Sequence, residues 1–240
     1  MKYEHGFYWP KTETHFIEYL NKNGGGEYQA VPKFALDIAV NDWDCVLDIG
    51  AHVGTWSRWF ATRANHVHSF EPVKTNFYCL EKNLEEFKNC TMYNNAVSDE
   101  SKYITMWKPA DLSNTGTFSS VPLPGWEELR YKAIAIDNLN LQPTVIKIDI
   151  QGGEYPALKG AKNTIAKYKP VICWENSKEN TDKEDIYNFL TDIGYRGIFQ
   201  FKEDAIWIHS SYQLTQEQQD KLNILFRENR KKLPIRTTTT

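Results

Sequence analysis

Two glycines, separated by three residues, follow an acid near residue 50, a pattern typical of a nucleoside-binding turn. The segment 46–54 reads Val-Leu-Asp-Ile-Gly-Ala-His-Val-Gly, so an apolar stretch ending in Asp48 and Ile49 leads into Gly50 and Gly54. This pattern predicts a buried parallel strand, a tight turn and then a helix. Glycines in such a turn let the backbone approach a ligand more closely than a side chain would allow. The chemistry that we expect here is cofactor binding.

The spacing of the two glycines favours a cofactor without a phosphate. Dinucleotide sites carry Gly-x-Gly-x-x-Gly, whose additional glycine admits a pyrophosphate to a helix N-terminus, and segment 50–54 lacks that pattern. S-adenosylmethionine is smaller and has a carboxylate that turn amides can receive. Glu71 follows by about 20 residues, the spacing at which an acid accepts hydrogen bonds from ribose hydroxyls. An ordinary turn beside a solvated acid is the plainer alternative.

Acids recur at or near the carboxyl ends of the predicted strands, where ligands bind in open α/β sheets. They are Asp48, Glu71, Asp149 and Glu175. In the segment 146–151, a period of two places Lys147, Asp149 and Gln151 on one face and three isoleucines on the other. Four acids in one crevice are costly unless they are hydrogen-bonded or used in chemistry. An internal Lys–Asp pair with a helix-capping glutamine would explain segment 146–151 without a ligand.

The composition fits a single α/β domain. The 240 residues are 41% hydrophobic, which is enough to bury a sizeable core, and no linker divides them. A formal net charge of −3 argues against a nucleic-acid partner, which needs a basic face. The four cysteines form no Cys-x-x-Cys pair and resemble reduced core thiols, and the charged N-terminus resembles neither a signal peptide nor a membrane span. We therefore expect a cytoplasmic protein without a membrane partner.

Strands and helices alternate along the chain, which predicts a mostly parallel sheet covered on both faces. The predicted strands occupy residues 45–49, 66–70, 90–97, 102–107, 145–150 and 171–174. The predicted helices occupy residues 28–39, 56–62, 73–87, 155–168, 185–193 and 214–230. Strands 196–201 and 205–209 flank a hairpin signal, so the sheet gains an antiparallel edge. The single domain (1–240) divides into an N-terminal helical lead (1–40), a core (41–210) and a C-terminal helix with a disordered tail (211–240).

Several motifs, in their order and spacing, resemble the FkbM family of S-adenosylmethionine-dependent methyltransferases. They are Val46–Gly54, Phe70-Glu71-Pro72, Asn95–Asp99, Ile136-Asp137, and Lys147–Glu154 followed by Leu158–Ala161. The resemblance implies the Rossmann-like class I methyltransferase fold: α/β, with a mostly parallel seven-stranded sheet, an antiparallel C-terminal hairpin and helices on both faces. It also implies O-methylation of a hydroxyl on a sugar, glycan or small metabolite. One departure is Gln151, where the family commonly has Glu. A glutamine at this position cannot serve as a carboxylate base.

Carried over to this chain, the family motifs imply roles for individual residues. The methionine part of the cofactor would be surrounded by Asp48, Gly50, Ala51, His52 and Gly54. Glu71, followed by Pro72, would hold the ribose, while Asn95 and Ala96 would lie near the adenine. Asp149 would face the amino group of the cofactor or the acceptor.

For methyl transfer to a hydroxyl, the protein has to position the acceptor and accept one proton from it. Methyl transfer from a sulfonium is an in-line displacement, so placing the acceptor oxygen contributes much of the rate. An alcohol must also lose its proton to a base, for which Asp149 ranks first, although binding the cofactor amine explains it equally well. Lys147 would orient Asp149 or an acceptor oxygen, and Glu154 is either a base or a stabiliser of the first helical turn after it. Further candidate bases are His52 and Glu175.

No spacing of residues demands a metal ion. His66 and His68 alternate on one strand face, but they lack a third ligand nearby. Two other functions stay open: a non-catalytic module that binds S-adenosylmethionine and, less favoured without Gly-x-Gly-x-x-Gly, a nicotinamide-dependent oxidoreductase. The small-molecule or carbohydrate acceptor would be selected by the long loop 108–130 and the N-terminal lead, since loops of that length usually act as lids or binding surfaces. The sequence names neither that acceptor nor an oligomeric state.

Overall fold

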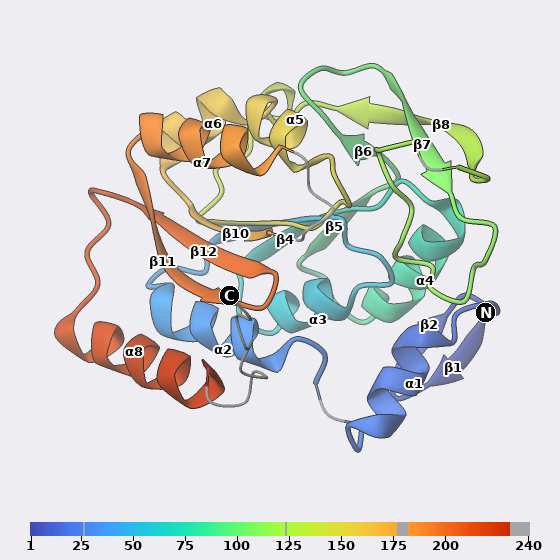
Figure 1. Ribbon diagram of the computed structural model, residues 1–240, viewed down its shortest axis with the longest axis horizontal. Helices are drawn as coiled ribbons and strands as arrows, with labels where there is room; N and C mark the ends of the chain where they lie inside the picture. The colour runs from blue at the N-terminus through green and yellow to red at the C-terminus, as the bar shows by residue number, and fades with distance from the viewer. Residues whose placement is uncertain (26, 123, 177–181, 231–240) are drawn as a thin grey trace, which may run out of the picture.

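The computed structural model describes residues 1–240 except 26, 123, 177–181 and 231–240. Within these residues, a seven-stranded sheet forms the middle layer of the molecule, with helices on both faces (Figure 1). Its strand order is β11-β12-β10-β9-β3-β4-β5. The strands are β3 (Cys45–Ile49), β4 (His66–Phe70), β5 (Cys90–Tyr93), β9 (Val145–Ile148), β10 (Val171–Glu175), β11 (Tyr195–Phe201) and β12 (Asp204–His209). The mostly parallel α/β fold expected from the sequence is therefore confirmed.

The sheet is parallel from β5 to β10 and ends in the predicted hairpin. The expected antiparallel edge is confirmed, because β12 runs antiparallel to β10 and pairs with the edge strand β11 in the hairpin. Burial explains the order of these two strands. Residues 205–208 of β12 are all buried and have a neighbouring strand on each side, whereas only Tyr195 and Phe199 of β11 are buried.

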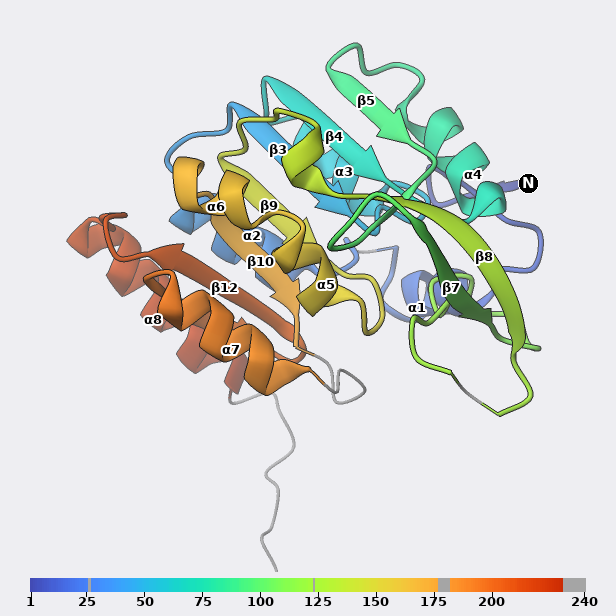
Figure 2. The same ribbon diagram turned by 90° about the horizontal axis from the view of Figure 1, so that it is seen from above.

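The helices divide between the two faces of the sheet (Figures 1 and 2). One face is covered by α2 (Ala30–Ala39), α3 (Thr55–Ala61), α4 (Lys74–Leu84) and α8 (Gln216–Arg230), the other by α5 (Glu154–Lys159), α6 (Lys162–Tyr168) and α7 (Lys183–Asp192). Successive residues of β3 serve both cores, because Val46 packs with Leu36 and Phe60 while Leu47 packs with Ile146 and Leu158. A strand buried on both faces explains the continuous apolar run in the sequence.

Two predicted elements are each divided in the structure. The predicted helix 155–168 is broken into α5 and α6 around Gly160, where a Cβ atom would lie 2.0 Å from the carbonyl oxygen of Ser98. The predicted strand 90–97 becomes β5 and a separate β6 (Ala96–Val97). Among the described residues, β6 joins a second sheet of three strands, in the order β6-β8-β7, with β7 (Tyr103–Lys108) and β8 (Glu127–Ile134). We did not predict β8, which occupies the end of the expected loop.

The N-terminal lead contains a hairpin and a first helix that we did not predict, as well as the expected helix ending at Ala39. Strands β1 (Lys2–Glu4) and β2 (Phe7–Trp9) precede α1 (His15–Lys22), and a short 3-10 turn, η1 (Ile136–Asn138), follows β8. The hairpin and α1 lie at the same end of the molecule as the three-stranded sheet (Figure 1). They are joined there by hydrogen bonds from the amides of Thr14 and His15 to the carbonyl oxygen of Ser113.

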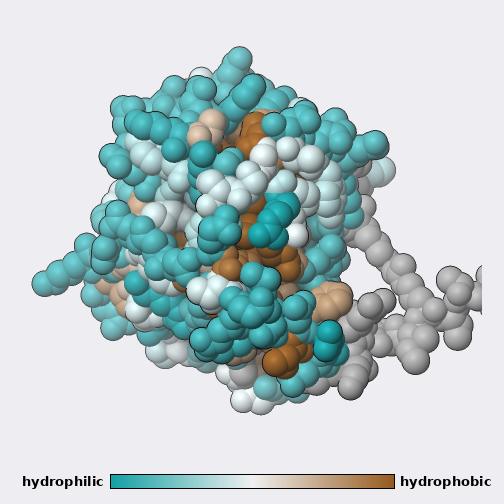
Figure 3. Space-filling view, turned by 90° about the vertical axis from the view of Figure 1, so that its left-hand side faces the viewer, coloured by the Kyte–Doolittle hydropathy of each residue, from teal (hydrophilic) through white to brown (hydrophobic). Residues whose placement is uncertain are grey.

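The opposite end of the molecule, formed by the edge strand and the C-terminal helix, is mostly hydrophilic, with apolar side chains gathered in a hollow (Figure 3). A groove on this side is lined by residues of β11, α7 and α8, among them Ile198, Phe199 and Leu222. The expected disordered tail, residues 237–240, lies outside the described residues. Within the described part, no helix is both long enough and apolar enough to cross a membrane.

Candidate functional site

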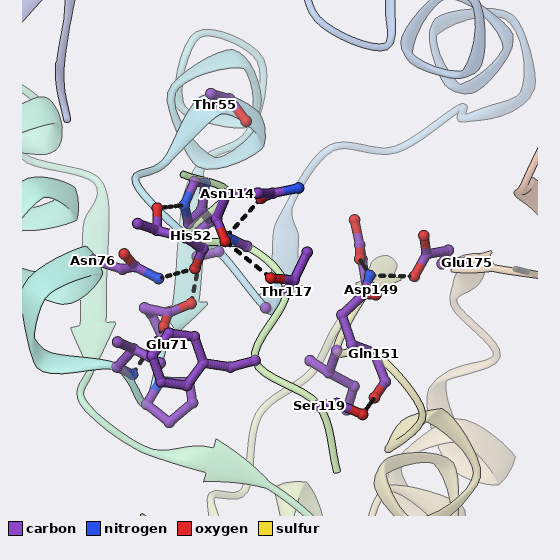
Figure 4. A pocket seen from close by; sticks show the side chains of 18 of the residues that line it. His52, Thr55, Glu71, Asn76, Asn114, Thr117, Ser119, Asp149, Gln151 and Glu175 are labelled. Carbon is purple, nitrogen blue, oxygen red and sulfur yellow. Dashed lines mark hydrogen bonds between the residues drawn. The ribbon is translucent and has the colours of Figure 1, made fainter. Parts of the chain in front are cut away.

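A cavity of about 680 Å³ opens at the carboxyl ends of β3, β4, β9 and β10. This volume lies within the roughly 300–1,000 Å³ typical of small-molecule sites. The turns after these strands form its floor, and residues of α1 and of the loop between β7 and β8 form its roof. In Figure 4, His52 and Glu71 lie on one side, while Asp149, Gln151 and Glu175 lie on the other. The cavity therefore gathers residues from segments that are far apart in the sequence.

The turn after β3 can be formed only by glycine at its first position. Gly50 has φ of +83°, and a Cβ atom there would lie 1.8 Å from the carbonyl oxygen of Asp149. This close approach brings the ends of β3 and β9 together. Ala51 and His52 follow Gly50 along the cavity wall, whereas Gly54 packs against Leu80 and does not line the cavity.

Asp48 lies beneath the cavity and does not line it. Its carboxylate has no exposed surface and accepts a hydrogen bond from the Ser57 hydroxyl, which in turn accepts one from Ser69. Lys147 Nζ lies 3.4 Å from Asp48 Oδ1 and 3.5 Å from Asp149 Oδ2, and it donates to the carbonyl oxygen of Gly50. Burial alone would lower the pKa of Lys147, but attraction by Asp149 and Asp48 outweighs it and raises that pKa. Lys147 therefore stays charged and forms ion pairs with both the buried Asp48 and the cavity residue Asp149.

Glu71 lines the cavity beside Pro72 and is only 5% exposed. Its two oxygens accept hydrogen bonds from the backbone amides of His52 and Val73, at 2.9 and 2.8 Å. Burial nevertheless raises the pKa of Glu71 to about 7. The Asn76 side chain is a third hydrogen-bond partner, and because the two carboxylate oxygens have four lone pairs together, acceptor capacity remains for a ligand. Two adjacent ligand hydroxyls match this arrangement.

A narrow apolar slot adjoins the cavity next to Pro72. Asn95 and Ala96 line it together with Phe70 and Ile104. The slot and the cavity share the wall residues Gly50, Pro72, Met106 and Ile150. The slot has a volume of only about 30 Å³, so it extends the apolar wall of the cavity near Glu71 and is too small to enclose a ring without widening.

The far side of the cavity holds two carboxyl groups joined by an amide. Gln151 Nε2 donates to Glu175 Oε2 at 2.7 Å and to Asp149 Oδ1 at 3.3 Å. Burial and then the neighbouring Asp149 raise the pKa of Glu175 well above its usual value, so Glu175 is protonated at neutral pH. Gln151 therefore holds the carboxyl groups of Asp149 and Glu175 near each other. Its backbone is left-handed, with φ of +53°.

Glu154 does not line the cavity. It is the first residue of α5, is 1% exposed, and accepts hydrogen bonds from the backbone amides of Ile150 and Gly152. Burial raises the pKa of Glu154 to about 7. These contacts fix the loop that carries Asp149 and Gln151, so we do not retain Glu154 as a candidate base.

Sequence reasoning missed the residues that hold the roof over the cavity. Glu13 is fully buried, and its carboxylate accepts hydrogen bonds from the amide of Phe16 and from both the amide and the hydroxyl of Thr115. The same hydroxyl lies 2.8 Å from His52 Nε2, and burial lowers the pKa of His52 to about 4. His52 is therefore neutral and links the floor to the roof. A lone acid in a polar lead gives no sequence signal for this role.

Two further wall residues, Tyr28 and Gln29, come from the chain just before α2. The Gln29 amide donates to the buried carboxylate of Asp204 at 3.3 Å, and burial raises the pKa of Asp204 to about 7. No group of three or more His, Cys, Asp or Glu side chains in the described part of the chain is arranged to hold a metal ion. His66 and His68 instead contact Thr91 and Tyr93 on β5.

Comparison with known proteins identifies the family. The model of the methyltransferase FkbM domain matches residues 48–196, which is more than half of the chain. The chain belongs to the FkbM methyltransferase family. The resemblance found in the sequence is thus confirmed, and the match contains the turn after β3, Glu71 and the segment 147–154.

Two relatives place this FkbM domain among known proteins. The hexuronic acid methyltransferase AglP of Haloferax volcanii is 27% identical over 169 residues, which cover 68% of each chain. The crystal structure of methyltransferase FkbM from Methylobacillus flagellatus KT superposes with a TM-score of 0.52 at 20% identity. That match covers 69% of this chain and 43% of the solved one, so this chain spans less than half of that protein. The structural likeness supports the fold.

Proposed function

We propose that this chain is an S-adenosylmethionine-dependent O-methyltransferase that acts on a hydroxyl of a sugar, glycan or small metabolite. The observation that carries the proposal is Glu71, a nearly buried carboxylate with free acceptor capacity, placed between a glycine turn and an apolar slot. Membership of a methyltransferase family supports the same cofactor. The rival nicotinamide cofactor would need room for a pyrophosphate, for which the turn lacks the third glycine.

The residues present fit S-adenosylmethionine part by part. In this proposal Glu71 accepts hydrogen bonds from the ribose hydroxyls, and the adenine lies on the side of Asn95 and Ala96, where the slot widens to admit the ring. The turn at Gly50 passes close under the cavity, where a Cβ atom has no space, and leaves room for the methionine part along Ala51 and His52. The bound cofactor supplies a methyl group attached to a positively charged sulfur.

Asp149 is the base that we propose for the acceptor. It is exposed to the cavity, with 24% of its side chain accessible, and Lys147 Nζ lies 3.5 Å from its Oδ2. The acceptor oxygen forms a bond to the methyl carbon as the carbon–sulfur bond breaks and its electron pair stays on sulfur. The hydroxyl proton passes to Asp149. Gln151 keeps Asp149 beside Glu175, whose protonated carboxyl can donate a hydrogen bond to the acceptor.

A carbohydrate acceptor is supported by the relative AglP, a hexuronic acid methyltransferase. Aromatic residues at the roof, Phe16 and Trp126, provide faces on which a sugar ring can pack. Both lie in the segments from which we expected acceptor specificity, the lead and the loop 108–130.

Mass spectrometry after incubation with S-adenosylmethionine and a panel of sugars, glycosides and phenols tests the proposal. We expect one acceptor class to gain the mass of one methylene while S-adenosylhomocysteine accumulates. A protein that binds the cofactor but methylates nothing across the panel would instead be the non-catalytic module. The Asp149→Asn variant serves as the control for background methylation.

A further inference from the structure

Carboxyl groups line the end of the cavity that contains Asp149, the base that we propose for the acceptor. Asp149, Glu175 and Glu203 line this end, and Asp204 lies behind them, 8% exposed, against Gln29. They come from four different elements: the turn after β9, the end of β10, the hairpin turn and the start of β12. The acidic character of this wall is therefore a property of the assembled fold.

Positive charge available to a ligand is scarce at the same end. Among the described residues that line the cavity, Lys147 is the sole Lys or Arg, and Asp48 and Asp149 already flank its ammonium group. The nearby buried Lys33 does not line the cavity and pairs with Glu27 at 3.1 Å. His52 is neutral, as described above, which leaves His15 at the exposed roof.

The remaining wall of this end is aromatic and uncharged. Phe16 and Tyr28 lie edge to face with ring centres 4.9 Å apart, and both border the cavity. Burial and the nearby Asp149 raise the pKa of Tyr28 above its usual value, so its hydroxyl stays protonated. The wall thus offers ring faces, a neutral hydroxyl and carboxyl oxygens to an acceptor.

We propose that the acceptor is an uncharged or amine-bearing sugar and that the site rejects a sugar that carries a carboxylate. A carboxylate entering this end of the cavity would lose its water while facing Asp149 and Glu203, beside the uncharged Glu175, and the described lining residues offer it no Lys or Arg other than Lys147, which Asp48 and Asp149 already flank. Buried charges need a partner, and like charges placed opposite one another oppose binding. Sugar hydroxyls and ammonium groups, in contrast, donate to carboxyl oxygens. The inference rests on the proposed methyltransferase function and separates this chain from AglP, whose name specifies a hexuronic acid.

Matched glycosides that differ in one group test this selectivity. We would compare phenyl glucoside, phenyl glucuronide and the phenyl glycoside of glucosamine, together with the galactose and mannose sets. Initial rates would be followed by release of S-adenosylhomocysteine and by product mass. Within at least one set, we expect kcat/KM for the neutral or amino sugar to exceed that for the uronide by about tenfold or more, which corresponds to about 1.4 kcal/mol.

A charge-reversal variant links the selectivity to the wall. Glu203→Lys places a cation at the exposed rim of the acidic end, so the ratio of neutral sugar to uronide should fall. Glu100→Lys makes the same change of charge at an exposed position that does not line the cavity, and it should leave the ratio unchanged. Equal ratios in the two variants would show that the acidic wall does not select the acceptor.

Two outcomes would overturn the proposal. A uronide methylated as fast as its neutral partner, or faster, would contradict it directly. If no glycoside is methylated although calorimetry shows that S-adenosylmethionine binds, the acceptor is not a sugar of the proposed class. Absence of cofactor binding in calorimetry is a different result, because it contradicts the proposed function itself.

Discussion

Glu71 combines burial with two backbone hydrogen bonds, and its chemistry depends on pH for that reason. Burial raises its pKa to about 7, so the carboxyl is protonated below that pH and ionised above it. The ionised form can accept hydrogen bonds from ribose hydroxyls with the lone pairs that the His52 and Val73 amides and the Asn76 side chain leave unused, whereas the protonated form loses part of this capacity. Because the ligand binds the ionised form better, affinity should rise with pH and level off above pH 7.

We therefore predict that adenosine, which presents the same ribose and carries no charge in this range, binds more weakly at pH 5.5 than at pH 8. The loss should approach about tenfold per pH unit at the acidic end. Glu71→Gln should bind adenosine weakly and without this pH dependence, although Glu154 and Asp204, whose pKa values are also raised to about 7, remain. Calorimetric titration at several pH values measures both effects. A flat pH profile for the unaltered protein would contradict the ribose assignment.

Asp149 and Glu154 lie five residues apart, and we assign a catalytic role to Asp149 and a structural role to Glu154. We predict that Asp149→Asn lowers kcat by on the order of 100-fold or more, because the acceptor then has no base. Glu154→Gln should instead lower the free energy of unfolding by about 1–3 kcal/mol, since backbone amides lose their charged acceptor. Steady-state kinetics and urea unfolding of both variants check this. If Asp149→Asn weakened cofactor binding and left kcat intact, Asp149 would bind the cofactor amine.

At the scale of elements, the turn between β3 and α3 holds two strand ends in contact. Gly50 is both left-handed and pressed against the Asp149 carbonyl, whereas Gly125, with φ of +80°, has no atom within 4 Å of an added Cβ. Alanine at either position adopts a strained backbone, but only alanine at Gly50 also forces the strands apart. The two glycines thus separate backbone strain from steric overlap.

We predict that Gly125→Ala costs about 1–2 kcal/mol of unfolding free energy from the left-handed backbone. Gly50→Ala should cost a further 1–3 kcal/mol, roughly, from overlap, and it should abolish cofactor binding. Urea unfolding and calorimetry provide the measurements. Equal losses of stability in the two variants would mean that the close approach at Gly50 relaxes without cost.

The roof depends on a single buried acid. Glu13→Ala leaves the amide of Phe16 and the amide and hydroxyl of Thr115 without their acceptor, so we predict a loss of about 1–3 kcal/mol of stability and a raised KM for the acceptor. Glu18→Ala changes an acid on α1, the helix that follows Glu13, whose side chain is 65% exposed, and it should cost less than about 0.5 kcal/mol. A Glu13→Ala variant as stable as Glu18→Ala would show that the roof does not depend on this contact.

The strands, the glycine turn and the acids at the strand ends could be predicted from the sequence because their signals are local. A buried strand followed by Gly50, or Lys147 and Asp149 alternating with isoleucines, is visible within a few residues. Glu13 could not be predicted, because its partner Thr115 is about a hundred residues away. Strand β8 did have a signal, the alternation of Leu129, Tyr131 and Ala133 with charged residues, which we interpreted as loop.

At the scale of the whole molecule, segments that are distant in the sequence line one shared cavity. The lead supplies Phe16 and Tyr28, the loop between β7 and β8 supplies Thr115 and Ser119, and the sheet supplies the acids. This shared cavity supports the proposal that the chain is a single domain, since ligand contacts with all three parts would stabilise them together. The acidic wall emerges only at this scale, which is why the sequence did not indicate the charge of the acceptor.

Calorimetric titration with S-adenosylmethionine and S-adenosylhomocysteine, with NAD as the control, tests the central claim most directly. We predict that the first two ligands bind, that NAD does not, and that Glu71→Ala weakens both affinities far more than it lowers the free energy of unfolding. Absence of binding by S-adenosylmethionine and S-adenosylhomocysteine, or binding of NAD in their place, would contradict the cofactor assignment and with it the proposed methyl transfer.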